Sequence, residues 1–156
     1  MLALYDMVAE SAERVVQALY EALEEGDVAR LQTLIGTHLE WWFHGPPSER
    51  HLVRMLTGVD HLGTFHFVPQ RGFVIGNMVM VEGHDRGVWW VHAWTVKGGI
   101  VTQLREYFNT TVTVTRVGHC DRCSEFLLHS PICATLWHSQ LSEASGKSLP
   151  GLVLAI

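Results

Sequence analysis

One carboxylate in this sequence stands among large apolar residues. Glu106 lies in the run REYFN, with Leu104 and Phe108 two positions to either side. In a β-strand these three side chains share a face, so the strand presents the carboxyl between two apolar groups. Burying a charge in such a place is costly unless the group is paired or has a function. A buried carboxyl can act as a general acid or base, and we single out Glu106 for that role.

Residues 88–114 position this carboxyl. Two segments rich in Val, Trp, Thr, Tyr and Phe flank Gly98 and Gly99, which predicts an antiparallel hairpin. A three-residue loop that includes Lys97 puts Glu106 opposite Trp90. That register gives one wall the side chains of Trp90, His92, Trp94, Leu104, Glu106 and Phe108.

A two-residue loop is the open alternative for this hairpin. It reverses the parity, so that Glu106 shares a face with Trp89, Val91 and Ala93. We adopt the three-residue loop. By the same counting, a three-residue turn at residues 85–87 places Glu82 opposite Trp90, on the face of Glu106.

Helices and a strand precede the hairpin. The apolar residues of a first helix recur at helical spacing up to Gly26: Val8, Ala12, Val15, Val16, Leu19 and Leu23. Asp27 can cap a second helix, which runs through Leu34, and Ser48 a third, which Gly58 ends. Residues 38–44 form a strand, with Trp41 on one face and Trp42 on the other.

The C-terminal part is predicted to hold an irregular loop at residues 118–133 and a tail at 143–156. Ser130 and Pro131 are expected to open a short helix through Leu141. Cys120, Cys123, His129 and Cys133 lack the two separated ligand pairs of a zinc finger. We expect no metal and no cofactor.

Composition limits the class of protein. The 156 residues predict one domain, and 47% apolar residues with 17% charged residues predict a folded one. A net charge of -5 argues against a nucleic-acid partner. The N-terminus is typical of a helix and not of a signal peptide, and no run is long and apolar enough for membrane insertion. We therefore expect a cytoplasmic protein with access to the nucleus.

The central strands are apolar on both faces. Trp89, Val91 and Ala93 alternate with the wall residues, whereas a sheet buried on one side alternates apolar with polar side chains. The helices can cover one face only. A homodimer that pairs through the face of Trp89 and Val91 is the simplest cover for the other.

Three segments of the sequence resemble the plant wound-induced protein 1 family, within the nuclear transport factor 2-like (SnoaL-like) superfamily. They are HLEWWFHGPPSERHLVRMLTG, VHAWTVKGGIVTQLREYFNTTVTV and TLWHSQLSEASGKSLPGLVLAI. The resemblance implies a single α+β domain over residues 1–156, a cone. Three N-terminal helices pack on a curved antiparallel sheet, followed by a short C-terminal helix and a tail.

The resemblance also bears on the site. In limonene epoxide hydrolase-like and polyketide cyclase-like members the acidic residue of this strand points into the pocket, which implies the same for Glu106. Their aromatic and amide positions match Trp42 and His44, but their Arg/Asp pair has no clear counterpart here. The candidate catalytic residues are therefore Glu106, His44 and His92. The candidate ligand-binding residues are Trp42, Met80, Glu82, His84, Trp90, Trp94, Leu104 and Phe108.

Two classes of function fit these residues. The first is binding of a small, mostly apolar metabolite in an aromatic-lined pocket, in a plant wound or stress context. A catalytic version is cofactor-independent isomerisation, cyclisation or hydration with Glu106. The second is a non-enzymatic interaction module of the same fold. In a purely structural alternative, Glu106 pairs with a buried Arg or His and the tryptophans are only core.

Overall fold

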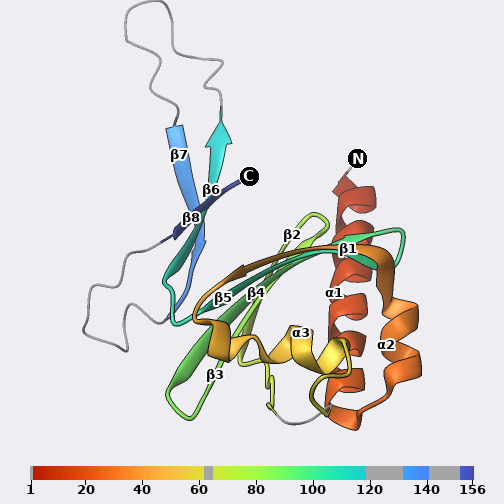
Figure 1. The fold of residues 1–156 in the computed structure, drawn as a ribbon. Helices are drawn as coiled ribbons and strands as arrows, with labels where there is room; N and C mark the ends of the chain where they lie inside the picture. The colour runs from red at the N-terminus through yellow and green to blue at the C-terminus, as the bar shows by residue number, and fades with distance from the viewer. Residues whose placement is uncertain (1, 62–64, 119–131, 141–151) are drawn as a thin grey trace, which may run out of the picture. The chain divides into compact units, whose positions relative to one another are not determined.

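The computed structural model describes residues 2–61, 65–118, 132–140 and 152–156. The chain divides into two compact units, Met1–Asn109 and Thr110–Ile156, and each is taken here by itself (Figure 1). The prediction of one domain over residues 1–156 stays a prediction.

The first unit begins with the predicted helices. They are α1 (Leu2–Glu25), α2 (Val28–Leu34) and α3 (His51–Leu56). Gly26 has a φ of 69°, which suits a residue that ends a helix. The Asp27 side chain accepts a hydrogen bond of 3.0 Å from the backbone N–H of Arg30, so the predicted cap of α2 is confirmed.

The start of the third helix differs from the prediction. Residues Pro47–Glu49 form a separate 3₁₀ turn, with Pro47 at its first position, and α3 starts only at His51. No side chain caps α3, so the prediction that Ser48 caps it is wrong.

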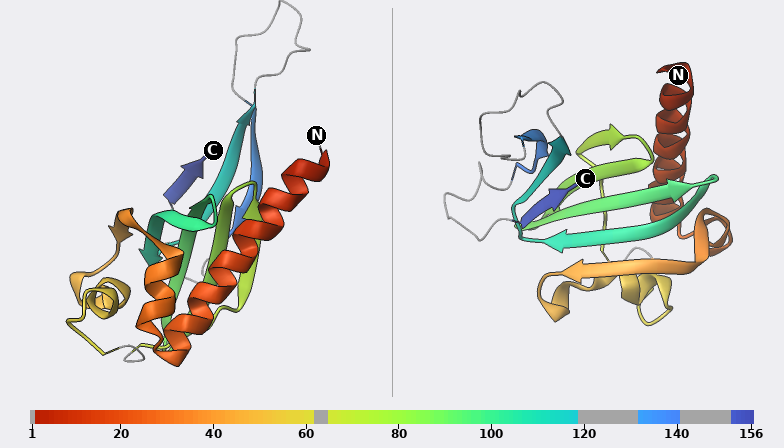
Figure 2. Two further views of the ribbon diagram at one scale, coloured as in Figure 1. Left: turned by 90° about the vertical axis from the view of Figure 1, so that its right-hand side faces the viewer. Right: turned by 90° about the horizontal axis from the view of Figure 1, so that it is seen from above.

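A five-stranded sheet forms the rest of the first unit, in the order β1-β5-β4-β3-β2. Its strands are β1 (Ile35–His44), β2 (Arg71–Ile75), β3 (Met78–Asp85), β4 (Val88–Lys97) and β5 (Ile100–Phe108). Four of them are antiparallel neighbours, whereas β1 runs parallel to β5. The sheet is therefore mixed and mostly antiparallel, and the fold class is α+β. Helix α1 crosses one face of this sheet (Figure 2).

The β4–β5 hairpin has a two-residue turn and a bulge. Lys97 pairs with Ile100, so Gly98 and Gly99 alone form the loop, and the predicted three-residue loop is wrong. The pairing then shifts, because Val96 faces Val101 whereas Thr95 faces Gln103. The extra residue is Thr102. One inserted residue reverses the parity of a strand, and the wall that the three-residue loop predicted is restored.

The β3–β4 connection also has a two-residue turn. Asp85 pairs with Val88, so Arg86 and Gly87 form the loop. No bulge is present between these two strands, and the predicted face of β3 is therefore wrong. Glu82 pairs with Val91, and Gly83 instead lies opposite Trp90.

The core of the first unit lies between α1 and the wall of β4 and β5. Side chains with less than 2% exposure include Leu19, Trp90, Trp94, Leu104 and Phe108. These residues belong to one cluster of buried apolar side chains. Burial of an aromatic or leucine side chain stabilises the fold by roughly 1.5–3 kcal/mol.

The second unit is a three-stranded sheet in the order β7-β6-β8. Its strands are β6 (Val112–Gly118), β7 (Ile132–His138) and β8 (Leu152–Ala155). The helix predicted to run through Leu141 is wrong over 132–138, where β7 pairs antiparallel with β6. Positions 118, 132 and 133 of the predicted loop belong to these strands. Residues 119–131 and 141–151 lie outside the described residues.

Within the described residues, no helix is long and apolar enough to cross a membrane.

Candidate functional site

A chain of hydrogen bonds links four buried side chains in the first unit. The indole N–H of Trp94 donates to the Tyr20 hydroxyl oxygen over 2.9 Å. That hydroxyl lies 2.6 Å from His92 Nδ1, and His92 Nε2 lies 2.7 Å from Glu106 Oε2. His92 and Glu106 are both 0% exposed. The chain therefore connects helix α1 to the carboxyl on β5 through a side chain of β4.

Burial acts on the ionisation of Tyr20. Desolvation raises the pKa of its phenol well above the ordinary value of 10.0. The hydrogen bond from Trp94 lowers this pKa, and the charge of Glu106 raises it. Because the rise dominates, Tyr20 keeps its proton over the physiological pH range.

One oxygen of the Glu106 carboxyl has no hydrogen-bond partner among the residues that the structure describes. Glu106 Oε2 is bonded to His92, whereas Oε1 is buried and contacts no hydrogen-bond donor among the described residues. A buried acceptor without a donor costs about 1–3 kcal/mol. Oε1 is therefore a position where a donor or an acidic proton of a bound molecule is favoured.

Aromatic rings surround the His92–Glu106 pair. The centroid of the Phe67 ring lies 5.1 Å from that of His92 and 5.3 Å from that of Trp90. Trp90 in turn lies 4.6 Å from His92. These rings exclude water, so charges on the pair interact more strongly than they would at the surface.

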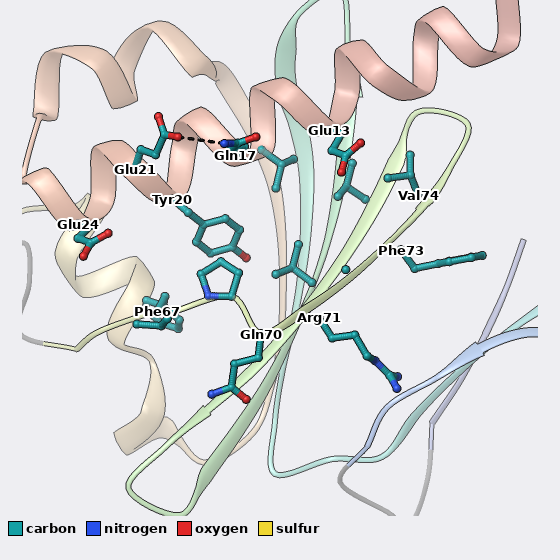
Figure 3. Close-up of a pocket in the computed structure, with 16 residues that line it drawn as sticks. Glu13, Gln17, Tyr20, Glu21, Glu24, Phe67, Gln70, Arg71, Phe73 and Val74 are labelled. Atoms are coloured by element: carbon teal, nitrogen blue, oxygen red, sulfur yellow. Dashed lines mark hydrogen bonds between the residues drawn. The ribbon is translucent and has the colours of Figure 1, made fainter.

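A cavity of about 660 Å³ lies against this cluster. It is bounded by α1, by the segment from Phe67 to Val74 and by β3 (Figure 3). Tyr20 and Phe67 line it and both contact His92, whereas His92 and Glu106 do not line it. The pair thus lies behind two residues of the cavity wall.

A second cavity of about 440 Å³ lies between α2, β1 and α3. Trp41 lines it. The indole N–H of Trp41 is buried and has no acceptor among the described residues.

The structure brings six of the predicted site residues together on the face toward α1. All six have exposures of 1% or less: Trp90, His92, Trp94, Leu104, Glu106 and Phe108. His92, and not Trp90, lies opposite Glu106.

Two predicted residues of β1 point the other way. Trp42 is 62% exposed, and His44 is exposed beside the Tyr107 ring. The alternation along β1 was predicted, but its inward face carries Trp41 and Phe43, which pack against the core. The prediction that Trp42 and His44 belong to one site with Glu106 is therefore wrong.

Three predicted residues of β3 also lie on the face away from Glu106. Because β3 and β4 are joined by a two-residue turn, Met80 pairs with Ala93 and His84 with Trp89. Glu82 is 1% exposed and forms an ion pair of 2.8 Å with Arg71. None of the three contributes to the cluster around His92.

Tyr20 and Phe67 are functional candidates that were not predicted. Tyr20 stands in the apolar stripe of α1 four residues after Val16, where a phenol needs a hydrogen-bond partner. That requirement is the signal that could have identified it. Phe67 comes from the irregular segment before β2, where no periodicity indicates which side chain turns inward.

The expectation of no metal concerns residues mostly outside the described part of the chain. Cys120, Cys123 and His129 lie there. Within the part that the structure describes, no three His, Cys, Asp or Glu side chains form a group that could hold a metal ion.

Comparison with known proteins identifies the fold and the family. An NTF2-like protein from Burkholderia xenovorans LB400 matches with a TM-score of 0.51 and 18% identity, over 65% of this chain and 85% of that one. The match shows that the fold is that of NTF2-like proteins.

Two plant proteins are similar in sequence. Wound-induced protein 1 of Solanum tuberosum is 47% identical over 108 residues, which are 67% of this chain and 100% of that protein. Senescence associated gene 20 of Arabidopsis thaliana is 44% identical over 110 residues, with the same coverage of both chains. The family model "Wound-induced protein WI12" matches residues 53–156. The resemblance found in the sequence is confirmed, and the chain belongs to the wound-induced protein WI12 family.

Proposed function

We propose that this protein binds a small, largely apolar molecule beside the His92–Glu106 pair, and that Glu106 transfers a proton to or from it. The observation that carries the proposal is the state of the Glu106 carboxyl. It is fully buried among aromatic rings, with one oxygen held by His92 and the other without a donor among the described residues. Such a group is available for isomerisation, cyclisation or hydration without a cofactor.

The cavity limits the kind of molecule. A volume of about 660 Å³ is in the range of pockets that hold small metabolites. Valines and Phe67 supply apolar walls, while Glu13, Glu21 and Glu24 of α1 stand at its edge (Figure 3). Arg71 also lines the cavity but is paired with Glu82, so these three carboxylates favour an uncharged or cationic ligand over a carboxylate or phosphate.

Access from the cavity to Glu106 requires one side chain to move. Phe67 separates the cavity from His92 and belongs to a segment outside helices and strands. Rotation of its side chain is the movement that would open a path from the cavity toward the His92–Glu106 pair. Tyr20, on the other side of this path, is held in place by its hydrogen bonds to His92 and Trp94.

Native mass spectrometry of the purified protein tests ligand binding. We expect a bound molecule of low mass on the unmodified protein. Val74→Trp fills the cavity from its wall and should remove this mass, whereas Val59→Trp, at an exposed position of the same unit, should keep it. An unmodified protein without bound mass, or equal retention by both variants, would contradict the proposal.

A non-enzymatic interaction module remains the alternative function. Trp42, 62% exposed on edge strand β1, is the observation in its favour, because exposed tryptophans often anchor a partner. Under our proposal Trp42→Ala leaves the bound mass unchanged.

The plant relatives suggest a role in wounding or senescence, where the small apolar ligand of our proposal would be a stress metabolite.

A further inference from the structure

Tyr20 is the residue of the buried chain that lies outside the region matched by the family model. It belongs to α1, whereas the match covers residues 53–156 and includes His92, Trp94 and Glu106. Its hydroxyl is shared between two residues of β4, with Trp94 at 2.9 Å and His92 at 2.6 Å. A helix outside the family match thus supplies a polar contact to the candidate acid/base pair.

We infer that Tyr20 is a positioning residue which holds neutral His92 in the tautomer protonated at Nε2, so that His92 donates to Glu106 and does not accept a proton from it. The inference rests on the proposed function for its meaning, since it leaves Oε1 as the oxygen that meets the ligand. Its geometry and its test do not depend on a ligand.

Counting donors and acceptors along the chain gives this proton arrangement. The indole N–H of Trp94 can only donate, so the Tyr20 oxygen accepts from it. The phenolic proton then needs an acceptor, and His92 Nδ1 is the group beside it. With Nδ1 as acceptor, neutral His92 carries its proton on Nε2 and donates it to Glu106 Oε2.

The competing arrangements leave one buried donor unused. If Glu106 carried the proton and donated it to Nε2, His92 would be protonated at Nδ1 and would donate to Tyr20. An imidazolium would donate to both neighbours in the same way. In either case the phenolic proton loses its acceptor on His92. The penalty for an unsatisfied buried donor favours protonation of neutral His92 at Nε2 over protonation at Nδ1 by roughly ten- to a hundredfold.

The consequence concerns the oxygen that takes part in proton transfer. Because His92 donates to Oε2, the free oxygen Oε1 is the one that accepts a proton from the ligand, and the electron pair of the broken bond stays on the ligand. The same proton is returned in a later step, so no co-reactant is consumed.

Nitrogen NMR of the full-length protein labelled with ¹⁵N-histidine tests the inference near pH 7. The His92 signals are identified by their loss in His92→Gln. We expect one protonated nitrogen, Nε2, and an unprotonated Nδ1. Tyr20→Phe should raise the fraction protonated at Nδ1 at least severalfold. His84, which contacts Gln70 on the opposite face of the sheet, should be unchanged and serves as the internal control.

Protonation of Nδ1 in the unmodified protein would overturn the inference, and so would a Tyr20→Phe spectrum identical to the original. If Tyr20→Phe does not fold, the unmodified spectrum decides alone. Absence of a bound molecule in mass spectrometry would defeat the proposed function but leave this result standing, so the two failures are distinguishable.

Discussion

His92 on β4 lies directly opposite Glu106 on β5, and its Nε2 lies 2.7 Å from Glu106 Oε2. Both side chains are completely buried. The partner of the candidate carboxyl is therefore a titratable group and not a fixed cation. His92 can donate a hydrogen bond to this carboxyl without itself carrying a charge.

Two buried carboxyls on opposite faces of the sheet should respond differently to loss of charge. Glu106→Gln can still accept the hydrogen bond from His92, so the free energy of unfolding should fall by less than about 1 kcal/mol. Glu82→Gln takes the countercharge from Arg71, which is 33% exposed, and should cost about 2 kcal/mol. Urea unfolding measures both. A larger loss for Glu106→Gln would identify Glu106 as a structural anchor.

Gly83 provides the space for Trp90. A Cβ atom at Gly83 would lie 2.5 Å from Trp90 Cζ2 and 2.5 Å from the Val68 carbonyl oxygen. Gly83→Ala should therefore destabilise the protein by about 1–3 kcal/mol through overpacking. Gly72→Ala is the matched control, because its Cβ would lie 3.5 Å from the Met80 carbonyl oxygen, an ordinary contact. Equal thermal midpoints for the two variants would show that Trp90 is not held against β3.

Tyr20 should make the stability depend on alkaline pH. Its pKa is raised in the folded state, so the phenol ionises more readily in the unfolded chain. The stabilisation is complete below the ordinary pKa near 10 and is lost as the pH rises from there toward the folded value. Above pH 10 the free energy of unfolding should fall with pH more steeply than in Tyr20→Phe, by up to about 1.4 kcal/mol per pH unit. Urea unfolding of both proteins at pH 9, 10 and 11 measures this pH dependence. An equal pH dependence in the two proteins would contradict the burial of this hydroxyl.

The homodimer through the outer face of the sheet stays a prediction. Trp89 lies on that face, half-buried against the His84 ring at 4.6 Å. Trp89→Glu would place a charge in the interface and should shift the protein toward monomer in light scattering. Val59→Glu, at an exposed position outside the sheet, is a control for adding an exposed charge. An unmodified protein that is monomeric at micromolar concentration would exclude this dimer.

The wall around Glu106 could be predicted from the sequence because alternation along β4 and β5 determines it. The loop length was wrong and a bulge at Thr102 was missed, and the two errors cancelled in parity. Between β3 and β4 no bulge compensates for the wrong turn length. The assumption of a three-residue turn therefore placed Met80, Glu82 and His84 on the wrong face. A hairpin sequence does not specify a bulge, because bulges depend on tertiary packing.

The remaining differences arise from contacts between distant segments. Tyr20 meets His92 across 72 positions of sequence, and no local pattern indicates that pairing. The strand alternation of β1 was predicted, but which of its two faces turns inward is set by its parallel pairing with β5. Before β7, Ser130 and Pro131 predict the start of a helix, whereas pairing with β6 makes 132–138 a strand. Sheet partners override local helix signals in such cases.

Hydrogen exchange into the bound molecule tests the central claim most directly. Protein carrying its copurified ligand is transferred into D₂O, and the released ligand is analysed by mass spectrometry. If Glu106 removes and returns a proton, the ligand gains deuterium at carbon in the unmodified protein. Ligand held by Glu106→Gln should stay unlabelled while the bound amount is unchanged. Equal labelling in the two proteins, or no labelling in either, would contradict proton transfer by Glu106.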